Sequence, residues 1–281
     1  FKGEIISFDS VQIYQGLDIG SAKPSLEEQK RVPHYLIDFA SPHKKLSVFE
    51  VVQEAKKKAF QILAKQKIPI FCGGTGLYFK ALFYGLFEGP PSQPHVRQKI
   101  RQEAKEKGVP FLHQKLKEID EKRAEKISEN DLIRIERALE VYYSTGKTLS
   151  EFYEEQKHNP DFHFLKIGLN YPREELYSRI EERVDFMLAQ GLLEETKKLH
   201  QKYPQSLVLQ SSIGYKELLE VLLNNTHLEK AVLQIKQNTR RFAKRQNSLF
   251  KSFNDTFWSI PPNLSDIFLW LEEKIGQKQE E

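Results

Sequence analysis

Two polar segments of this chain contain residue types that could act as a base and as hydrogen-bond donors. Asp9 and Ser10 come directly after residues 4–8, which read as a strand, and Gly-Gly-Thr-Gly at 73–76 follows the apolar segment 68–72. In open parallel sheets, ligands bind at the carboxyl ends of the strands, where a glycine turn at a helix N-terminus offers backbone N–H groups. We therefore expect both segments to converge on one crevice.

Each of these segments also has a simpler structural interpretation. An aspartate such as Asp9 is typical of a helix N-cap or a turn. The glycines at 73–76 could form a tight strand-to-helix turn that binds no ligand. The occurrence of two such segments in one predicted sheet is what favours a ligand site.

A predicted helix near the C-terminus, residues 228–251, carries a cluster of cations. The helical period places Arg240, Arg241, Lys244 and Arg245 on one face, extended by Lys236 and Lys251. A solvated cationic face is the usual outcome of such a run. No acidic residue occurs between positions 233 and 253, so contact with the phosphates of RNA or of a pyrophosphate is favoured. The residues expected on the opposite, packed side are Ile235, Phe242 and Leu249.

The composition is that of a globular protein with a sizeable core. The chain has 281 residues, 39% hydrophobic and 29% charged, and its net charge of +4 is too small to identify a partner. Its one cysteine, Cys72, excludes internal disulfides and cysteine-built zinc sites, and we expect it to be buried and inert. No apolar run approaches the roughly 18 residues of a membrane span, and no signal peptide opens the chain. A cytoplasmic protein is expected.

The elements that must position the polar segments alternate between strand and helix. Strand 35–38, helix 47–65 and strand 68–72 give the rhythm of a parallel sheet with helices on its faces. After the loop 89–94 the pattern is wholly helical, and strand character returns at 162–169. The further elements expected are helix 130–143 capped by Gly146, helix 172–191, a helix from Gly214, strand 256–260 and a frayed tail, 276–281. We predict a core of residues 1–92 and 157–281 and a helical insertion, 93–156.

Taken together in order, these segments resemble the tRNA dimethylallyltransferase (tRNA isopentenyltransferase) family. The resemblance rests on residues 9–14, 16–24, 32–38, 73–78, 134–141, 213–217 and 239–246 and extends over nearly the whole chain. It implies an α/β fold, a P-loop-NTPase-like parallel sheet with flanking helices, and an all-helical insertion that contacts tRNA. It also implies transfer of a dimethylallyl group from dimethylallyl pyrophosphate to N6 of the adenosine 3′-adjacent to the anticodon. That adenosine must be flipped out of the stacked anticodon loop to reach the active site.

The same resemblance assigns roles to individual residues. Asp9 is the implied base and Thr75 hydrogen-bonds near the reacting atoms, while Mg²⁺ and basic side chains neutralise the departing pyrophosphate. The implied partners are a tRNA anticodon stem-loop and dimethylallyl pyrophosphate, for a monomeric protein that does not bind membranes. Contact with tRNA is implied for Asp9, Ser10, Val11, Gln12, Thr75, Arg97, Ile133, Arg134, Ile135, Glu136, Arg137, Ser211, Ser212, Ile213, Gly214, Tyr215, Lys216, Thr239, Arg240, Arg241, Phe242, Ala243, Lys244, Arg245 and Gln246.

The chain departs from the family pattern in one important respect. The family begins with a strand and a Walker A loop that cradles pyrophosphate, and this sequence opens at what would be the second strand, so a truncated sequence is expected. Arg240 or Lys244 would then remain to contact pyrophosphate. Smaller departures are Ser211-Ser212 and Ser248-Leu249.

Two alternative functions stay open at this point. One is an adenylate isopentenyltransferase acting on a free nucleotide, which would not need the insertion and the basic helix. The other is a catalytically inactive RNA-binding homologue, if the Walker A loop is truly absent.

Overall fold

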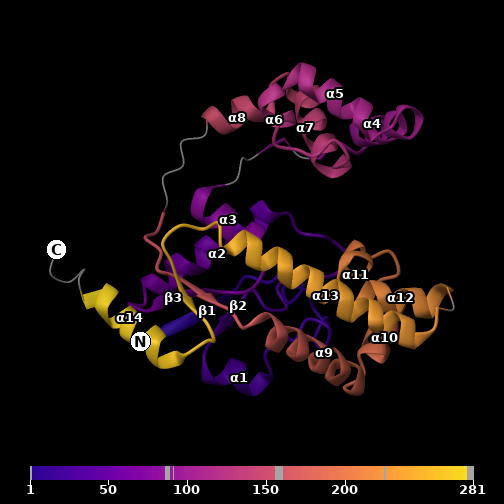
Figure 1. The fold of residues 1–281 in the computed structure, drawn as a ribbon. Coiled ribbons are helices and arrows are strands. Elements are labelled where there is room, and N and C mark those ends of the chain that lie inside the picture. The colour runs from indigo at the N-terminus through magenta and orange to yellow at the C-terminus, as the bar shows by residue number, and fades with distance from the viewer. Residues whose placement is uncertain (1, 86–88, 91, 156–160, 225, 277–281) are drawn as a thin grey trace. The chain divides into compact units, whose positions relative to one another are not determined.

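A computed structural model of the chain describes residues 2–85, 89–90, 92–155, 161–224 and 226–276 (Figure 1). The chain divides into two compact units, Phe1–Phe83 with Phe162–Glu281, and Tyr84–Asp161. The sequence-based boundaries lay at 92/93 and 156/157, so the second unit includes more of the segment before its first helix than expected. The expected tail beyond Gly276 lies outside the described residues.

The first unit contains two small parallel sheets. In one, β1 (Gly3–Ser7) lies between β2 (His34–Tyr35) and β3 (Ile68–Cys72). Ser7 pairs with Cys72, so the chain leaves β1 and β3 at the same level of the sheet. In the other, β4 (Lys166–Leu169) pairs with β5 (Thr256–Ser259). Within the described part of the chain, β3 pairs with β1 alone, and its other edge has no strand partner.

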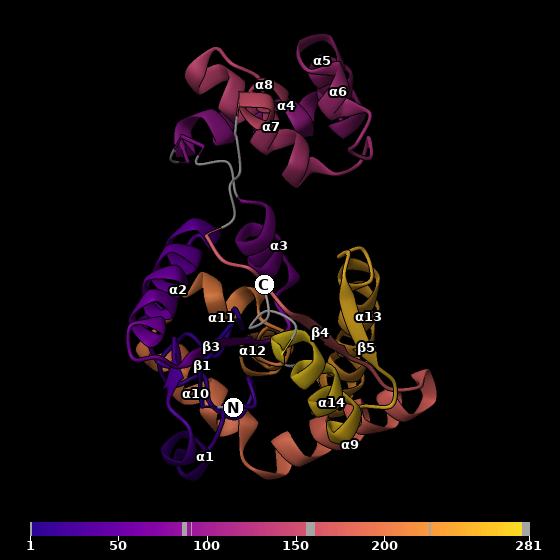
Figure 2. The same ribbon diagram turned by 90° about the vertical axis from the view of Figure 1, so that its left-hand side faces the viewer.

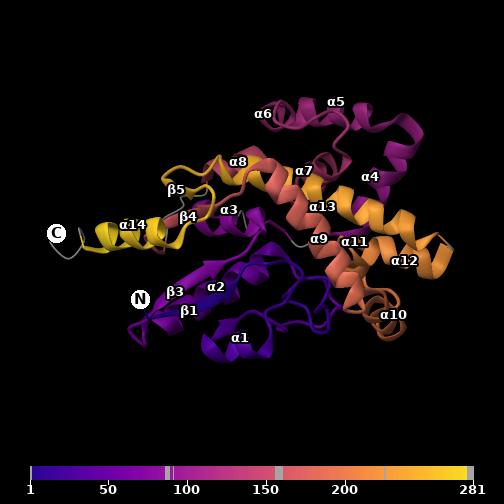
Figure 3. The same cartoon turned by 60° about the horizontal axis from the view of Figure 1, so that its bottom comes forward.

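Helices supply the remainder of the first unit. The helix α2 (Val48–Leu63) begins with a capping box formed by Ser47 and Glu50, and its buried face includes Val51, as the periodicity predicts. The basic helix α13 (Leu228–Phe250) lies beside α9 (Arg173–Ala189) (Figure 3). The other helices are α1 (Leu26–Arg31), α3 (Gly76–Tyr84), α10 (Leu192–Lys202), α11 (Leu207–Ser211), α12 (Tyr215–Asn224) and α14 (Leu264–Gly276).

Two sequence-based expectations about this unit need correction, and one helix was not predicted. The predicted strand 35–38 ends at Tyr35, because Leu36 and Asp38 adopt left-handed backbone conformations with φ of 62° and 51°. The predicted burial of β3 is wrong: Ile70 is 44% exposed and Cys72 is also exposed, since the described elements leave one side of this edge strand open. Enough protein surrounds Cys72 to raise the pKa of its thiol by desolvation. The helix α14, which the sequence analysis did not predict, lies beside β5 (Figure 2).

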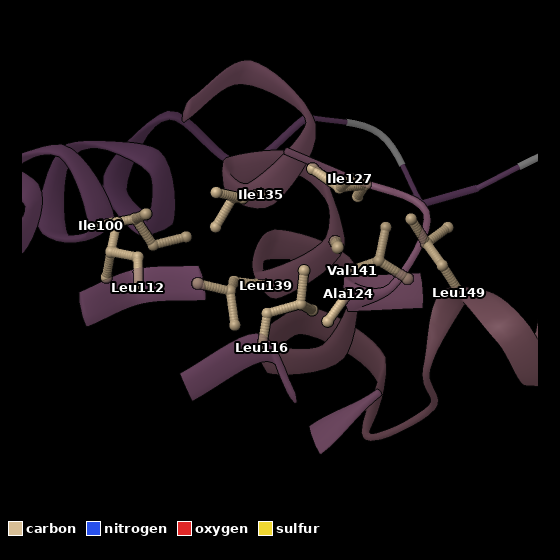
Figure 4. Close-up of a cluster of buried hydrophobic side chains, with 10 residues drawn as sticks. Ile100, Leu112, Leu116, Ala124, Ile127, Ile135, Leu139, Val141 and Leu149 are labelled. Atoms are coloured by element: carbon tan, nitrogen blue, oxygen red, sulfur yellow. The ribbon is translucent and has the colours of Figure 1, made fainter. Parts of the chain in front are cut away.

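The second unit is entirely helical in its described residues, as predicted. Its helices are α4 (Pro94–Lys107), α5 (Val109–Ile119), α6 (Glu121–Ala124), α7 (Leu132–Thr145) and α8 (Leu149–Glu155). Leu112, Leu116, Ile135 and Leu139 lie at the centre of its apolar core (Figure 4). Asp131 caps the start of α7, and Gly146 ends it in a left-handed conformation, as expected. No helix in the described parts of either unit has the length and apolar character needed to cross a membrane.

Candidate active site and nucleic-acid interface

The polar segments after β1 and β3 meet, as the sequence predicts. The backbone N–H of Ser10 donates to Thr75 Oγ1 at 2.9 Å, and the N–H of Thr75 donates to the carbonyl of Phe8 at 3.2 Å. Asp9 Oδ1 accepts from the N–H groups of Val11 at 2.7 Å and Gln12 at 3.2 Å. Asp9 therefore forms the turn that its residue type suggests. Its second carboxylate oxygen has no hydrogen-bond partner among the described residues and remains available to a ligand.

Glycines at 73, 74 and 76 allow three elements to come into close contact at this point. A Cβ on Gly73 would lie 2.3 Å from the carbonyl oxygen of Phe8, and one on Gly74 would lie 2.2 Å from Gln246 Nε2. Gln246 Nε2 also donates to the carbonyl of Gly74 at 2.8 Å. Gln246, which was expected to contact tRNA, thus joins the basic helix α13 to the turn that holds Thr75.

The Gln12 side chain, also expected to contact tRNA, is largely engaged with the protein itself. Its Nε2 donates to the carbonyls of Ser21 at 3.3 Å and Ala22 at 3.1 Å, and Ser7 Oγ donates to its Oε1 at 3.0 Å. The Nε2 group therefore has two acceptors within the protein. The remaining lone pair of Oε1 is the part of this amide that is free to meet a ligand.

Arg183 on α9 is a candidate site residue that the sequence reasoning missed. Its side chain is exposed, and no ion pair or hydrogen bond joins it to another described residue. The surrounding protein lowers its pKa by desolvation, and the carboxylate of Asp9 opposes this shift. A guanidinium that has no ion pair within the described residues, and whose pKa responds to the charge of Asp9, is a candidate to bind an anion. Residues 172–191 were predicted to be helical, but no local pattern distinguishes Arg183 from the other arginines of that helix.

The cations of α13 fall into two groups. Arg240 forms an ion pair with Glu181 of α9, and Lys236 pairs with Asp185 at 2.7 Å. The sequence offers no carboxylate between positions 233 and 253, but α9 supplies neutralising partners for these two residues. Among the residues of the predicted cationic face, Arg241, Lys244, Arg245 and Lys251 are exposed and have no ion pair within the described residues.

The other predicted contacts on α13 have varied surroundings. Phe242, expected to be packed, is exposed, and the guanidinium of Arg245 lies over its ring at 5.7 Å. Thr239 is partly buried and its hydroxyl donates to the carbonyl of Ile235 at 2.8 Å. Ala243 is also partly buried.

Several residues of the segment 211–216 are buried, which does not fit the contact with RNA predicted for them. The Tyr215 side chain is 0% exposed, and Ser212 and Gly214 are buried. Protein atoms cover the side chain of Tyr215 completely, so it offers structural support rather than a surface for RNA. The members of this segment that reach solvent are Ser211, Ile213 and Lys216.

In the second unit, buried carboxylates hold several of the predicted RNA contacts. Arg97 binds Glu140 with two hydrogen bonds of 2.8 and 3.0 Å, and Arg137 Nη1 binds the same carboxylate at 2.7 Å. Glu136 binds Arg101 in the same way. Glu140 is 0% exposed; burial raises its pKa, but the hydrogen bonds from Arg97 and Arg137 outweigh burial and lower it to about 2.

The remaining predicted contacts on α7 differ in exposure. Arg134 is 64% exposed and forms a surface ion pair with Asp131 at 3.3 Å. Ile133 is also exposed, whereas Ile135 is fully buried in the core shown in Figure 4 and cannot reach RNA. Among the predicted α7 contacts, Arg134 and Ile133 are therefore exposed, whereas Arg137 is only partly exposed.

The described residues contain no cluster of three or more histidine, cysteine, aspartate or glutamate side chains that could hold a metal ion. Mg²⁺ bound chiefly through substrate phosphates and water does not need such a cluster. The oxygens available near the strand ends, from Asp9 and Thr75, are hard ligands of the kind that Mg²⁺ accepts.

Fold and site together define an α/β protein with an all-helical insertion and a polar site at the carboxyl ends of its strands. Comparison with known families gives a match to the IPP transferase family over residues 12–253. A tRNA dimethylallyltransferase from Acetivibrio thermocellus is 47% identical over 260 residues, which is 92% of this chain and 83% of that protein.

Solved structures agree with the match in sequence. The tRNA isopentenylpyrophosphate transferase of Bacillus halodurans aligns with a TM-score of 0.70 and 35% identity, over 99% of this chain and 88% of that one. A eukaryotic dimethylallyltransferase acting on tRNA aligns with a TM-score of 0.76 and 31% identity, over 94% and 68%. The chain belongs to the IPP transferase family, and the predicted P-loop-NTPase-like α/β fold is confirmed.

Proposed function

We propose that this protein transfers a dimethylallyl group from dimethylallyl pyrophosphate to N6 of the adenosine 3′-adjacent to the anticodon of tRNA. The observation that carries the proposal is the meeting of Asp9 and Thr75 at the ends of two paired strands, with one carboxylate oxygen of Asp9 free. The Acetivibrio thermocellus relative named above is a tRNA dimethylallyltransferase. An enzyme acting on free adenylate is not favoured by this relative.

Asp9 is the base in this proposal. The adenine N6 amine is a weak nucleophile because its lone pair is delocalised into the ring, so removal of its proton as the bond forms assists attack. A positioned base typically contributes about 10²–10⁴-fold. The Val11 and Gln12 N–H groups hold Oδ1, which orients the free oxygen Oδ2. The N6–carbon bond forms as the carbon–oxygen bond to pyrophosphate breaks, and the N6 proton passes to Asp9.

Thr75 and Arg183 serve the departing pyrophosphate and the reacting atoms. Thr75 Oγ1 already accepts from Ser10, so its hydroxyl hydrogen is free to donate to substrate. Arg183 contributes a positive charge where negative charge develops on the leaving group. Mg²⁺, when bound, neutralises further phosphate charge. Lys244 remains a candidate for contact with either pyrophosphate or RNA, whereas Arg240 is less available because Glu181 binds it.

The test compares Asp9→Asn with the natural protein and with Asp255→Asn. Asp255 lies on the turn before β5 in a left-handed conformation that asparagine tolerates. Incorporation of labelled dimethylallyl pyrophosphate into an anticodon stem-loop RNA is followed at saturating RNA. We expect kcat of Asp9→Asn to fall at least about 100-fold, with RNA affinity nearly unchanged, because the base acts in the transition state. Near-normal turnover of Asp9→Asn would rule out this role for Asp9.

A further inference from the structure

A single carboxylate on α10 binds a loop that is distant in sequence. Glu195 Oε2 accepts from the backbone N–H groups of Asp18 at 3.2 Å and Ile19 at 2.9 Å. Its Oε1 accepts from the N–H of Gly20 at 3.2 Å and from the hydroxyl of Tyr215 at 2.6 Å. Consecutive N–H groups that face one anion fix the conformation of the backbone that carries them. The mechanism proposed above does not use this cluster.

Tyr215 supports the same loop from beneath. Its ring is fully buried, and a Cβ on Gly20 would lie 2.6 Å from its Cζ atom, so only glycine allows this approach. Burial first, and then the charge of Glu195, raise the pKa of the Tyr215 hydroxyl well above its usual value. The hydroxyl therefore stays protonated and donates to Glu195 at every physiological pH.

The end of the clamped loop holds the side chain of Gln12. Gln12 Nε2 donates to the carbonyls of Ser21 at 3.3 Å and Ala22 at 3.1 Å. Because two carbonyl oxygens cannot face the amide oxygen, this contact also fixes which way round the amide lies. Ala22 has φ of 48°, a conformation that costs an alanine on the order of 1 kcal/mol and persists only where neighbours enforce it.

Gln12 is in turn adjacent to the proposed base. Its backbone N–H donates to Asp9 Oδ1, and its side-chain Oε1, with one lone pair left, faces Ser7 rather than the loop. The orientation of this oxygen depends on the positions of two carbonyls, and those positions depend on the loop that Glu195 and Tyr215 hold.

We propose that Glu195 and Tyr215 are positioning residues for the transfer reaction: they clamp residues 18–20 and thereby orient the Gln12 amide beside Asp9. The proposal rests on the proposed function for its kinetic consequence. Its structural content, that the amide of Gln12 is fixed through Glu195, stands independently of the reaction.

The kinetic test is a double-mutant cycle in the natural protein. Glu195→Gln keeps the shape of the side chain but removes its charge and one acceptor, and we expect kcat to fall about tenfold. In a Gln12→Ala background the same change should alter kcat less than twofold, because the amide that it positions is gone. Glu194→Gln, an exposed neighbour on α10, is the matched control and should leave kcat unchanged. Equal losses in both backgrounds, or no loss in either, would overturn the proposal.

Two further measurements separate the possible failures. Tyr215→Phe removes one hydrogen bond without changing volume. It should lower kcat by about threefold, with the same dependence on Gln12, and it tests the proposal even if Glu195→Gln folds poorly.

The second measurement does not depend on activity. The side-chain Nε2 hydrogens of Gln12 are observed by NMR and are assigned by their loss in Gln12→Ala. We expect their exchange with water to accelerate at least about tenfold in Tyr215→Phe or Glu195→Gln. Unchanged exchange would refute the clamp, whereas absence of transfer by the parent protein would refute the proposed function alone.

Discussion

Helices α7 and α13 were both predicted to present arginines to RNA, and their surroundings differ. On α7, Arg137 is bound to the buried Glu140, which also binds Arg97 of α4. On α13, Arg241 and Lys244 have no ion pair within the described residues. The sequence of α7 contains Glu136 and Glu140 among its arginines, whereas the only acidic residue of α13 is Glu229 at its start. The availability of a cation therefore depends on the carboxylates that reach it, from the same helix for Arg137 and from α9 for Arg240.

The energies of the two arrangements also differ. Removing a cation from a buried carboxylate leaves that charge poorly compensated and costs about 3–5 kcal/mol when the pair is fully buried. Glu140 has two arginine partners and both are partly exposed, so the cost is smaller here. An exposed pair such as Arg134 with Asp131 is worth about 0–1 kcal/mol and exchanges readily for a phosphate. Cations without an ion pair, such as Arg241 and Lys244, can bind a phosphate without first losing a carboxylate partner.

The largest expected effect tests the two groups of cations on α13 against each other. We expect Arg241→Gln with Lys244→Gln to raise the dissociation constant for an anticodon stem-loop at least about tenfold near 0.1 M salt. The log–log slope of affinity against salt should fall by roughly 1.4 to 1.8, at 0.7 to 0.9 per lost phosphate contact. Fluorescence anisotropy across a salt series measures both quantities.

The matched control is Lys236→Gln with Arg240→Gln, which removes the same charge from the same helix. These residues are paired with Asp185 and Glu181. Their loss should therefore reduce the salt slope by less than about half of the reduction expected for Arg241→Gln with Lys244→Gln. Equal changes in slope for the two double variants would show that the ion pairs with α9 do not limit access to RNA.

A second, smaller effect separates two arginines of α7. Arg134→Gln should reduce the salt slope by about 0.7 while leaving stability unchanged, because its side chain is exposed. Arg137→Gln should instead destabilise the second unit by about 1–3 kcal/mol through the lost charged hydrogen bond to Glu140. RNA titration and hydrogen exchange of α4 and α7 distinguish them. If Arg137→Gln flattened the salt dependence and left exchange unchanged, Arg137 would be a phosphate contact.

The meeting of Asp9 with Thr75 could be predicted because it follows from local patterns. Two apolar segments ending in polar turns give paired strands, and parallel strands bring those turns to the same edge. The helical character of the insertion and the caps at Asp131 and Gly146 follow from equally local signals. All of these are properties of short stretches of sequence.

The features that were missed depend on partners far apart in the chain. The pairing of Arg240 with Glu181 requires α9 and α13 to lie side by side, which neither helix's sequence indicates. The segment 211–216 was expected to contact RNA, but Tyr215 is buried because Gly20 and Glu195 come to it from two other segments. Periodicity gives the face of a helix, and only tertiary structure determines what covers that face.

The smallest expected effect sharpens the contrast through pH. The pKa of Glu140 is lowered from 4.5 to about 2, so the stability that its ionised form provides is complete above pH 4.5 and is lost as the pH falls towards 2. In Glu140→Gln this contribution is absent at every pH. The difference in stability between parent and variant should therefore be largest near neutral pH and shrink in acid.

Hydrogen exchange of peptides from α4 and α7, referenced to the unfolded chain at each pH, measures this difference. Peptides from α13 are the internal control, because Arg241, Lys244 and Arg245 have no buried carboxylate partner and Glu140→Gln should leave α13 exchange unchanged. If the difference between parent and variant stayed constant from pH 7 to pH 2, Glu140 would not be ionised in the folded protein. The arginines of α7 would then be no more restrained than those of α13, and the distinction between the two helices would fail.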